Sequence, residues 1–536
     1  MSQPKSQPRT QLLRQIHPKA RTFSLICLGC SKNLVDAERI AGLLTEAGWR
    51  IVREPRGAAC VIVHTCGFLQ SSRDESWEHI ERALQWKRAG EVSFVVVTGC
   101  FAQRDDGRLG TLGAANGGIT GKLATDSGSN EVGDDAAGNH SATAEIDAVV
   151  GVTAREQIVA VLEALERRRR TYHGDGTGLN APAEKTNSSN LPAPDEKTSG
   201  TPDSPQVWFA KYPCPISDDR RYRLTPQHIA YLKIAEGCDR RCSYCAIPII
   251  RGPHVSKPIY QAVAEARELV ASGAREIILL AQDLTFYGLD WLDATGRRTG
   301  PQLATLLREL VAIPNLKWIR LMYLYPMHVT DELIDVIASE PKVLPYLDIP
   351  LQHASDAILR SMNRVVDRAR MEELLTKLRE RIPGLVLRTT MMVGFPGETD
   401  AVFEELCEFV QRWRFERLGG FVFSPEPGTR AFELPESDQI PTEVAEQRFR
   451  RLMKIQSGIA FAWNDSQIGR VVDVILDTPI RSEKNTWIGR TAGDAPDVDG
   501  VVYVTGGDTQ DLAQGQIVPC EIVASQGFDL VAVPTE

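Results

Sequence analysis

The sequence lacks any long apolar run. No stretch of 18 apolar residues occurs among its 536 residues, so no membrane-spanning helix is predicted. The first residues, MSQPKSQPRTQLLRQIHPKART, lack the apolar core of a secretory signal. We therefore expect a cytoplasmic protein, in which clustered cysteines more often bind metal than form disulfides.

The sequence also lacks an excess of positive charge. The formal net charge is −9, whereas a protein that clasps bulk nucleic acid usually has a basic face. Residues 465–536 contain 12 Asp and Glu but only 4 Lys and Arg, a net charge of −8 that leaves the rest near neutral. An acidic segment of this kind repels phosphate and is expected to attract a basic partner.

Three of the 11 cysteines stand close together in the run EGCDRRCSYC, as Cys238, Cys242 and Cys245. Iron–sulfur clusters normally take four cysteine ligands, so three thiolates can hold a cluster with one iron left open. An open position is typical of a working metal site. The alternative is a structural zinc knuckle, which needs a fourth ligand, and His254 is the only near candidate.

The N-terminal part predicts a parallel α/β domain. The apolar runs TFSLICLG, ACVIVHT and SFVVVTG alternate with the helical patterns NLVDAERIAGLLTEAGW and SWEHIERALQWKRAG. This βαβαβ order is typical of a parallel sheet with helices on its faces. A Gly-, Ser-, Ala- and Asn-rich insert over residues 105–144 interrupts the domain.

A second set of cysteines follows these three strands. Cys30 follows the first strand in LGCSKN, Cys66 follows the second in HTCGF, and Cys100 follows the third in VTGC. Ligands of open α/β sheets bind outside the carboxyl ends of the strands, so we expect the three thiols to converge. The alternative is that they are ordinary buried cysteines. Cys27 lies inside the first strand and is expected to pack there.

The βα rhythm returns after a second low-complexity stretch. Six units, with strands IAYLKIAEG, EIILLAQD, WIRLMYLYP, YLDIPLQ, VLRTTMMVGFP and RLGGFVFSPE, predict a partial, six-stranded (β/α) barrel. Five later runs, GRVVDVILD, WIGRTA, GVVYVTG, QIVPCEIVA and DLVAVP, predict a small β-barrel. The expected parts are a disordered tail (1–20), an N-terminal domain (21–170), a flexible linker (171–223), the partial barrel (224–464) and the small barrel (465–536).

In such a barrel the active site forms at the carboxyl ends of the strands, and the run CDRRCSYC follows the first of them. Three further motifs end strands at the same predicted mouth: AQD (281–283), LQHAS (351–355) and MVGFPGET (392–399). Each is expected either to touch a cofactor or substrate or only to form a turn or cap the next helix.

These motifs together resemble a known family over nearly the whole chain. The spacing C-x3-C-x-aromatic-C on a partial barrel is similar to the radical S-adenosylmethionine (SAM) enzymes. The runs LGCSKNLVDAE, HTCGF and VTGC resemble the methylthiotransferases, and the C-terminal barrel resembles a TRAM domain. LDIPLQHASD, LRTTMMVGFPGET and DAPDVDG are similar to the RimO type within that family. The chain departs from the family at His64, where Asn is usual.

The resemblance implies two 4Fe-4S clusters. One would be held by Cys238, Cys242 and Cys245 and would bind SAM at its open iron. The other would be held by Cys30, Cys66 and Cys100 and would carry or deliver sulfur. The implied reaction adds a methylthio group to the β-carbon of an aspartate in small-subunit ribosomal protein S-twelve, with SAM as both radical source and methyl donor.

The implied partners are that basic protein, an electron donor such as flavodoxin or ferredoxin, and a sulfur donor. No side chain is predicted to be catalytic. The sister tRNA-modifying enzyme is the second hypothesis and a zinc-binding scaffold the third. The acidic C-terminal segment favours a basic protein over tRNA, because a tRNA-gripping domain should be basic.

Overall fold

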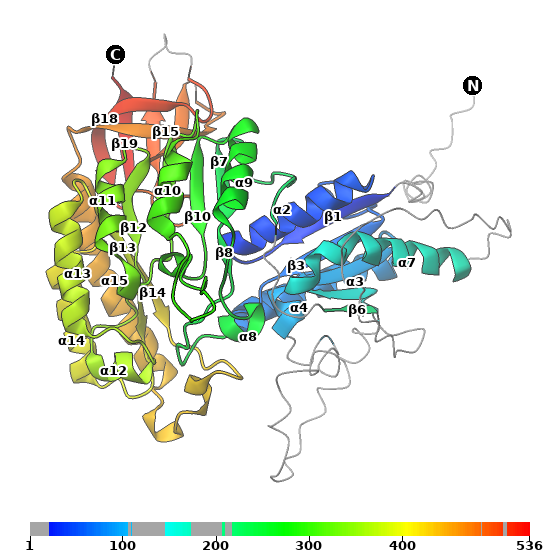
Figure 1. The fold of residues 1–536 in the computed structure, drawn as a ribbon, viewed down its shortest axis with the longest axis horizontal. Helices are drawn as coiled ribbons and strands as arrows, with labels where there is room; N and C mark the ends of the chain where they lie inside the picture. Colours follow the sequence, from blue (N-terminus) through cyan, green and yellow to red (C-terminus); the bar gives the residue numbers. More distant parts are fainter. Residues whose placement is uncertain are drawn as a thin grey trace, which may run out of the picture. The chain divides into compact units, whose positions relative to one another are not determined.

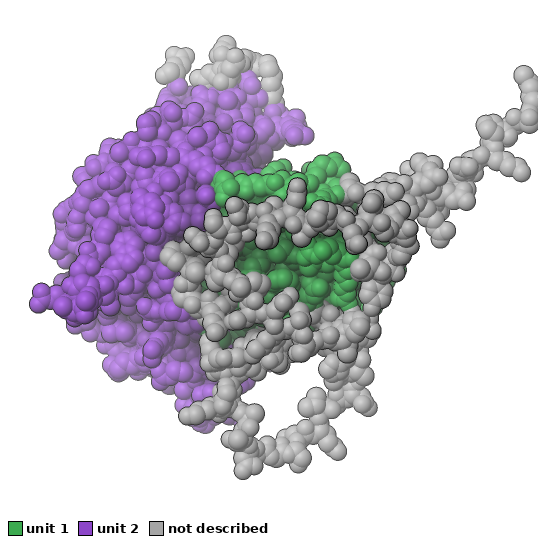
Figure 2. Space-filling model, turned by 45° about the vertical axis from the view of Figure 1, so that its right-hand side comes forward, with its two compact units in different colours: residues 1–212, 220–222, 249–251 green, residues 213–219, 223–248, 252–536 purple. Residues whose placement is uncertain are grey.

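The structure, a computed structural model, describes residues 21–104, 109, 145–172, 206–209, 217–483, 485–506 and 512–535. The chain forms two units: residues 1–212, 220–222 and 249–251 make unit 1, and residues 213–219, 223–248 and 252–536 make unit 2 (Figure 2). The tail expected over 1–20 lies outside the described residues. So do the insert over 105–144, apart from Leu109, and most of the linker over 171–223.

Unit 1 is built on a sheet of six parallel strands in the order β2-β1-β3-β4-β5-β6 (Figure 1). The strands are β1 (Thr22–Cys27), β2 (Arg50–Ile51), β3 (Cys60–Thr65), β4 (Phe94–Gly99), β5 (Ala148–Gly151) and β6 (Gln206–Trp208). The helices are α2 (Ser31–Glu46), α3 (Gln70–Arg88), α4 (Cys100–Arg104), the 3-10 turn η1 (Val152–Gln157) and α7 (Ile158–Tyr172).

Helices cover both faces of this sheet. Along β3, Ile62 packs in one hydrophobic cluster with side chains of α2 and α7, whereas Val61 and Val63 pack in another with side chains of α3. A strand that is buried on both faces has a continuous apolar sequence, which explains the runs CVIVHT and FVVVTG. The predicted parallel α/β class is confirmed.

The sheet contains the three predicted strands, β1, β3 and β4, followed by β5 at AVVG. Two short strands, β2 and β6, extend it further. β2 pairs with β1 at one edge, and β6 pairs with β5 at the other. β6 lies within the stretch where a linker was expected. Strands of two and three residues are too short to show a periodic pattern, so the sequence does not reveal them.

Unit 2 contains a second sheet of six parallel strands in the order β14-β13-β12-β11-β10-β7. The strands are β7 (Ile229–Lys233), β10 (Glu276–Leu280), β11 (Trp318–Leu321), β12 (Val343–Asp348), β13 (Val386–Val393) and β14 (Arg417–Val422). They correspond to the six predicted strands, so the six-stranded (β/α) architecture is confirmed. A short antiparallel pair, β8 (Ala235–Glu236) and β9 (Val255–Ser256), follows β7.

Helices alternate with these strands (Figure 1). They are α8 (Ile247–Arg251), α9 (Ile259–Ala271), α10 (Leu303–Val311), α11 (Asp331–Ser339), α12 (Asp356–Ser361), α13 (Arg368–Arg381), α14 (Asp400–Trp413) and α15 (Thr442–Asp465). The 3-10 turns are η2 (Leu284–Phe286), η3 (Pro326–His328), η4 (Arg430–Glu433) and η5 (Glu436–Asp438). Within the described ranges, none of the helices has both the length and the apolar character needed to cross a membrane.

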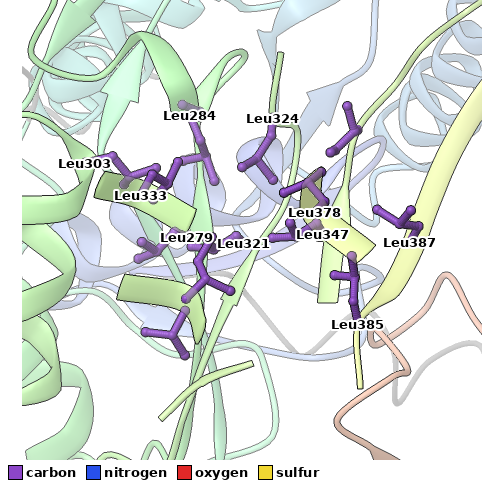
Figure 3. Close-up of a cluster of buried hydrophobic side chains, with 14 of the residues drawn as sticks. Leu279, Leu284, Leu303, Leu321, Leu324, Leu333, Leu347, Leu378, Leu385 and Leu387 are labelled. Carbon is purple, nitrogen blue, oxygen red and sulfur yellow. The ribbon is translucent and has the colours of Figure 1, made fainter. Parts of the chain in front are cut away.

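A row of leucines crosses five strands of this sheet. The register pairs leucines on neighbouring strands, and all five are buried: Leu232, Leu279, Leu321, Leu347 and Leu387. They belong to one cluster with leucines of the helices, several of which Figure 3 shows. Each buried leucine contributes about 1.5–3 kcal/mol, so this row is a main source of the unit's stability.

The C-terminal residues form a closed barrel of five strands, in the order β15-β16-β17-β19-β18. The strands are β15 (Val471–Pro479), β16 (Thr486–Thr491), β17 (Val502–Thr505), β18 (Ile517–Gln526) and β19 (Asp529–Pro534). They match the five predicted runs, and their inward side chains form a separate hydrophobic cluster. The predicted small β-barrel is confirmed.

Buried charges join this barrel to the amino-terminal ends of the parallel strands. Glu276, the first residue of β10, lies 2.7 Å from Arg490 of β16 and 2.7 Å from Arg320 of β11. Arg490 also pairs with Asp477 of β15, which lies 2.7 Å from the ring of His228, just before β7. These contacts lie at the end of the sheet opposite to the strand carboxyl ends.

Two more aspartates of the C-terminal segment pair with arginines of the parallel sheet. Asp494 lies 2.6 Å from Arg417, and Asp499 lies 3.6 Å from Arg388. Asp499 also accepts a hydrogen bond of 2.7 Å from the hydroxyl of Tyr346. Some of the acidic residues counted in the sequence therefore hold the C-terminal barrel on the parallel sheet and are not available to a partner.

Glu276 provides a test of this junction. Replacing it by Gln leaves two buried guanidinium groups short of a carboxylate, and breaking a buried pair costs about 3–5 kcal/mol. We expect Glu276→Gln to lower the free energy of unfolding by that amount in denaturant titrations. Glu332→Gln is the matched control: it breaks an exposed pair with Arg308 and should cost less than about 1 kcal/mol. Equal costs in the two variants would contradict this account.

The same junction should weaken in acid. Burial alone would raise the pKa of Glu276, but Arg490 and Arg320 outweigh burial and hold that pKa below its usual value. A carboxyl whose pKa is lower in the folded state stabilises the fold above its unfolded pKa, and this contribution is lost as the pH falls through the folded pKa. The wild type should therefore lose more stability than Glu276→Gln between neutral pH and pH values below the ordinary glutamate pKa.

Candidate metal centres

The first cysteine set follows three neighbouring strands of unit 1. Cys30 is the residue before α2 and comes shortly after β1, Cys66 directly follows β3, and Cys100 directly follows β4. β3 is paired in parallel with both β1 and β4. The carboxyl ends of neighbouring parallel strands lie on the same side of a sheet, so the three cysteines lie together there. α/β proteins bind ligands outside these strand ends.

Two glycines let the backbone pass close to these cysteines. Gly29 has φ +90°, and a Cβ there would lie 3.1 Å from the Sγ of Cys66. Gly99 has φ +98°, and a Cβ there would lie 2.5 Å from the carbonyl oxygen of Thr65. Glycine is therefore needed directly before Cys30 and Cys100, since a side chain would be both strained and obstructed.

Asn33 connects the ends of the three strands. Its Nδ2 donates to the carbonyl oxygens of Leu28 (2.9 Å) and Thr65 (3.0 Å), and its Oδ1 accepts from the thiol of Cys100 at 3.3 Å. These atoms belong to the segments that follow β1, end β3 and follow β4. One fully buried amide thus fixes the spacing of the backbone that carries the cysteine set.

Cys27 and His64 lie within the strands themselves, before the carboxyl ends that carry the cysteine set. Cys27 is the last residue of β1 and is in register with His64 of β3. Burial raises the pKa of Cys27 to about 12, with a further contribution from Asp36. The side chain of His64 is fully buried and is in register with Thr98 of β4 on its other side. Both positions agree with the expectation that Cys27 packs in the strand.

The second set lies in the loop after β7 and β8, at the carboxyl end of the first strand of the (β/α) sheet. The backbone N–H of Cys238 donates to the carbonyl oxygen of Gly252 at 3.0 Å, and that of Cys245 donates to Cys242 at 3.2 Å. Gly237 is required here, because a Cβ would lie 1.9 Å from the carbonyl oxygen of Pro253. The first bond ties the start of the CDRRCSYC run to Gly252, and the second forms a turn between its last two cysteines.

One arginine within this loop, Arg240, and one outside it, Arg364, lie close to its cysteines. Arg364 lies 4.0 Å from the Sγ of Cys242, donates to the hydroxyl of Tyr244 at 3.3 Å and donates to the carbonyl oxygen of Pro350 at 2.6 Å. The guanidinium groups of Arg240 and Arg364 lie 4.2 Å and 4.6 Å from the centre of the Tyr325 ring. Cationic groups beside the thiols favour the thiolate form, which is the form that binds metal.

Burial disfavours the thiolate form of several of these cysteines. Burial raises the pKa of Cys238, Cys245 and Cys100 to about 12. Neighbouring thiols add to the increase, while Arg251 opposes it at Cys100 and Arg364 opposes it at Cys245. Metal binding to either set must therefore release protons.

The other three mouth motifs are held in different ways. In AQD, the carboxylate of Asp283 lies 2.8 Å from Nε of Arg240 in the cysteine loop. In LQHAS and MVGFPGET, His353 and Glu398 contact each other at 3.2 Å, and both are fully buried. Thr399 accepts a hydrogen bond from Val402 and caps α14. Asp283 thus supports the cysteine loop, whereas the other two motifs join neighbouring loops and begin a helix.

Each set offers three cysteine thiols, which are the usual ligands of an iron–sulfur cluster. In the part of the chain that the structure describes, no group of three or more His, Cys, Asp or Glu side chains is placed to hold one metal ion. His254, the candidate for a zinc knuckle, has its Nε2 3.1 Å from the hydroxyl of Ser256.

Three side chains at these sites were not predicted from the sequence. Asn33 and Arg251 reach the first set, and Arg364 reaches the second. The motifs LGCSKNLVDAE and IPIIRG contain two of them, but contacts across 67, 151 and 122 residues of sequence leave no local pattern.

Three family models match separate parts of the chain. Residues 22–118 match the uncharacterized protein family UPF0004, residues 232–410 match the radical SAM superfamily, and residues 468–534 match the TRAM domain. The first cysteine set lies within the first match, and the second set lies within the radical SAM match.

Similar proteins extend over nearly the full length. "Ribosomal protein uS12 methylthiotransferase RimO" of Opitutus terrae is 38% identical, covering 95% of this chain and 96% of that protein. The proteins of the same name from Myxococcus xanthus and Thermosynechococcus vestitus are each 38% identical, covering 96% of this chain and 91% and 98% of their own lengths. The chain therefore belongs to the RimO family of radical SAM methylthiotransferases.

Solved structures are more distant. A radical SAM methyltransferase, TsrM from Kitasatospora setae, has a TM-score of 0.46 and 14% identity, covering 77% of each chain. No functional conclusion is drawn from that similarity.

Asn33 provides the test of how the first site is built. Replacing it by Leu leaves the buried carbonyl oxygen of Thr65 and the partly buried carbonyl oxygen of Leu28 without this donor, at a cost of about 1–3 kcal/mol for the buried one and less for the other. We expect Asn33→Leu to lower the free energy of unfolding accordingly. Gln85→Ala, which removes an exposed amide on α3, is the control and should change stability by less than about 0.5 kcal/mol. A neutral Asn33→Leu would show that the amide does not hold the strand ends.

Proposed function

We propose that the chain adds a methylthio group to the β-carbon of an aspartate in ribosomal protein uS12, using two 4Fe-4S clusters and SAM. The name of the relatives supports the choice of this substrate. The observation that carries the proposal is the pair of cysteine sets, each at the carboxyl end of a parallel sheet. A single cluster would need only one of them.

In this proposal Cys238, Cys242 and Cys245 hold the cluster that binds SAM. A β-carbon has no acidic proton, so no side-chain base can activate it, and the bound cofactor supplies the radical chemistry. The chain's own groups position the cysteine loop: Asp283 holds Arg240, and Arg364 holds Tyr244 and the carbonyl oxygen of Pro350.

Cys30, Cys66 and Cys100 hold the second cluster, which would provide sulfur. Cys30 is exposed, whereas Cys100 is buried against Asn33. This gradient would leave one side of the cluster open to a sulfur donor or to the target while the other side is fixed. An electron donor such as flavodoxin or ferredoxin, and a cytoplasmic location, belong to the same proposal.

Surface charge supports a basic protein as the substrate. After the buried aspartates are set aside, the described residues from 465 onward still expose more acidic than basic side chains: Asp465, Asp473, Glu483, Asp497 and Glu521 against Arg470 and Arg481. Such a surface repels a phosphate backbone and attracts lysine and arginine. The described surface of this segment is therefore acidic, but fewer residues make it so than the sequence count suggests.

Separate loss of the two sets tests the division of labour. Cys238→Ala, Cys242→Ala or Cys245→Ala should abolish SAM cleavage in the purified, reconstituted enzyme. Cys30→Ala, Cys66→Ala or Cys100→Ala should stop methylthiolation but leave measurable SAM cleavage. Cys407→Ala, which removes a buried cysteine of α14 outside both sets, should retain both reactions. Full methylthiolation by the N-terminal variants would refute the assignment of the second cluster.

The substrate is tested in cells. Mass spectrometry of ribosomal protein uS12 from cells that lack this chain should show loss of the methylthio mass, and restoring the wild-type gene should return it. An unchanged mass would refute the substrate. Salt-sensitive, tight tRNA binding by the full-length protein, with loss of a tRNA methylthio group in the same cells, would favour the tRNA-modifying alternative.

A further inference from the structure

A buried arginine from a distant part of the sequence reaches the first cysteine set. Arg251 follows Cys245 by six residues, yet residues 249–251 belong to unit 1. Its side chain is 2% exposed. Its Nη2 lies 3.4 Å from the Sγ of Cys100, 2.7 Å from Oδ1 of Asn33 and 3.0 Å from Oδ2 of Asp36.

Arg251 is part of a buried charge network on α2 and η1. The other carboxylate oxygen of Asp36 pairs with Arg155, and both side chains are 1% exposed. Glu156, the neighbour of Arg155, pairs with Arg39 at 2.8 Å. Arg251 and Arg155 thus share the carboxylate of Asp36, and an anionic sulfur at Cys100 would be a further partner for Arg251. Pairing of this kind offsets the cost of burying the guanidinium charge.

A cation at this place has a definite effect on an iron–sulfur cluster. Reduction adds a negative charge to the cluster, and hydrogen bonds to the ligand sulfurs set its potential. An N–H donor that carries a positive charge stabilises the more negative, reduced state, and the effect is strong where water is excluded. Removing the positive charge should therefore make the cluster harder to reduce.

We infer that Arg251 is a positioning residue that raises the reduction potential of the cluster held by Cys30, Cys66 and Cys100, by donating to the sulfur of Cys100. This inference rests on the proposed function, because it requires a cluster at that set. Asp36 acts in the opposite direction, since its carboxylate offsets the charge of Arg251.

The test uses the full-length chain with Cys238, Cys242 and Cys245 all replaced by Ala, so that only the first set can hold a cluster. After anaerobic reconstitution, the midpoint potential is measured by redox titration followed by electron paramagnetic resonance. In this parent, Arg251→Gln should lower the potential by at least a tenfold change in the equilibrium constant, which is about 59 mV for one electron. Arg251→Lys keeps the charge and should restore most of the difference.

Asp36→Asn is the second variant, and it should shift the potential in the opposite direction. It removes the anion but keeps the shape, so the charge of Arg251 acts on the cluster without compensation. General damage to the fold would not move two variants in opposite directions. If Arg251→Gln fails to retain a cluster, an Asp36→Asn potential equal to or below that of the parent still overturns the inference, because the inference requires Asp36 to offset the charge of Arg251.

Lys87→Gln is the matched control. Lys87 of α3 lies 2.6 Å from Asp147, which directly precedes β5. This pair therefore lies at the amino-terminal ends of the strands, opposite to the cysteines. Its loss should leave the potential unchanged. Equal potentials in the parent, Arg251→Gln and Asp36→Asn, or shifts of the same sign in both variants, would overturn the inference. A parent without iron would instead refute the proposed second cluster.

Discussion

The parallel β-ladder is the constraint on which the rest of this structure depends. Strands that run in the same direction all end at one edge, so residues that follow them in sequence meet in space. Unit 1 uses this geometry to gather Cys30, Cys66 and Cys100 from strands far apart along the chain. In unit 2 the same geometry places the loop of Cys238 at the carboxyl end of β7, while the C-terminal barrel occupies the amino-terminal ends of the strands.

Convergence of the backbone alone does not build the sites. Gly29 and Gly99 remove side chains where loops cross, and Asn33 joins three strand ends through one amide. Arginines then supply the charge that thiolates need: Arg251 contacts the first set and Arg364 lies beside the second. Each set thus has at least one buried sulfur with a guanidinium group nearby, and the cation favours the thiolate form that binds metal.

The sequence predicted much of this fold, because apolar runs of five to eight residues mark strands covered on both faces. CVIVHT and FVVVTG became β3 and β4, and the six barrel runs became the second sheet. β2 and β6 were not predicted, since they are too short to show a pattern. Asn33, Arg251 and Arg364 were not assigned, because their partners are distant in sequence. The net charge predicted the surface only in part. A residue count cannot separate Asp494 and Asp499, which pair with arginines of the parallel sheet, from the exposed Asp473 and Glu521.

Iron and sulfide analysis of the anaerobically purified and reconstituted wild-type chain tests the central claim most directly. Two 4Fe-4S clusters predict about eight irons and eight sulfides per chain, and about four of each when either cysteine set is replaced by Ala. About four irons in the wild type, unchanged when Cys30, Cys66 and Cys100 are replaced, would contradict the second cluster. Stoichiometric zinc in place of iron would contradict the account as a whole.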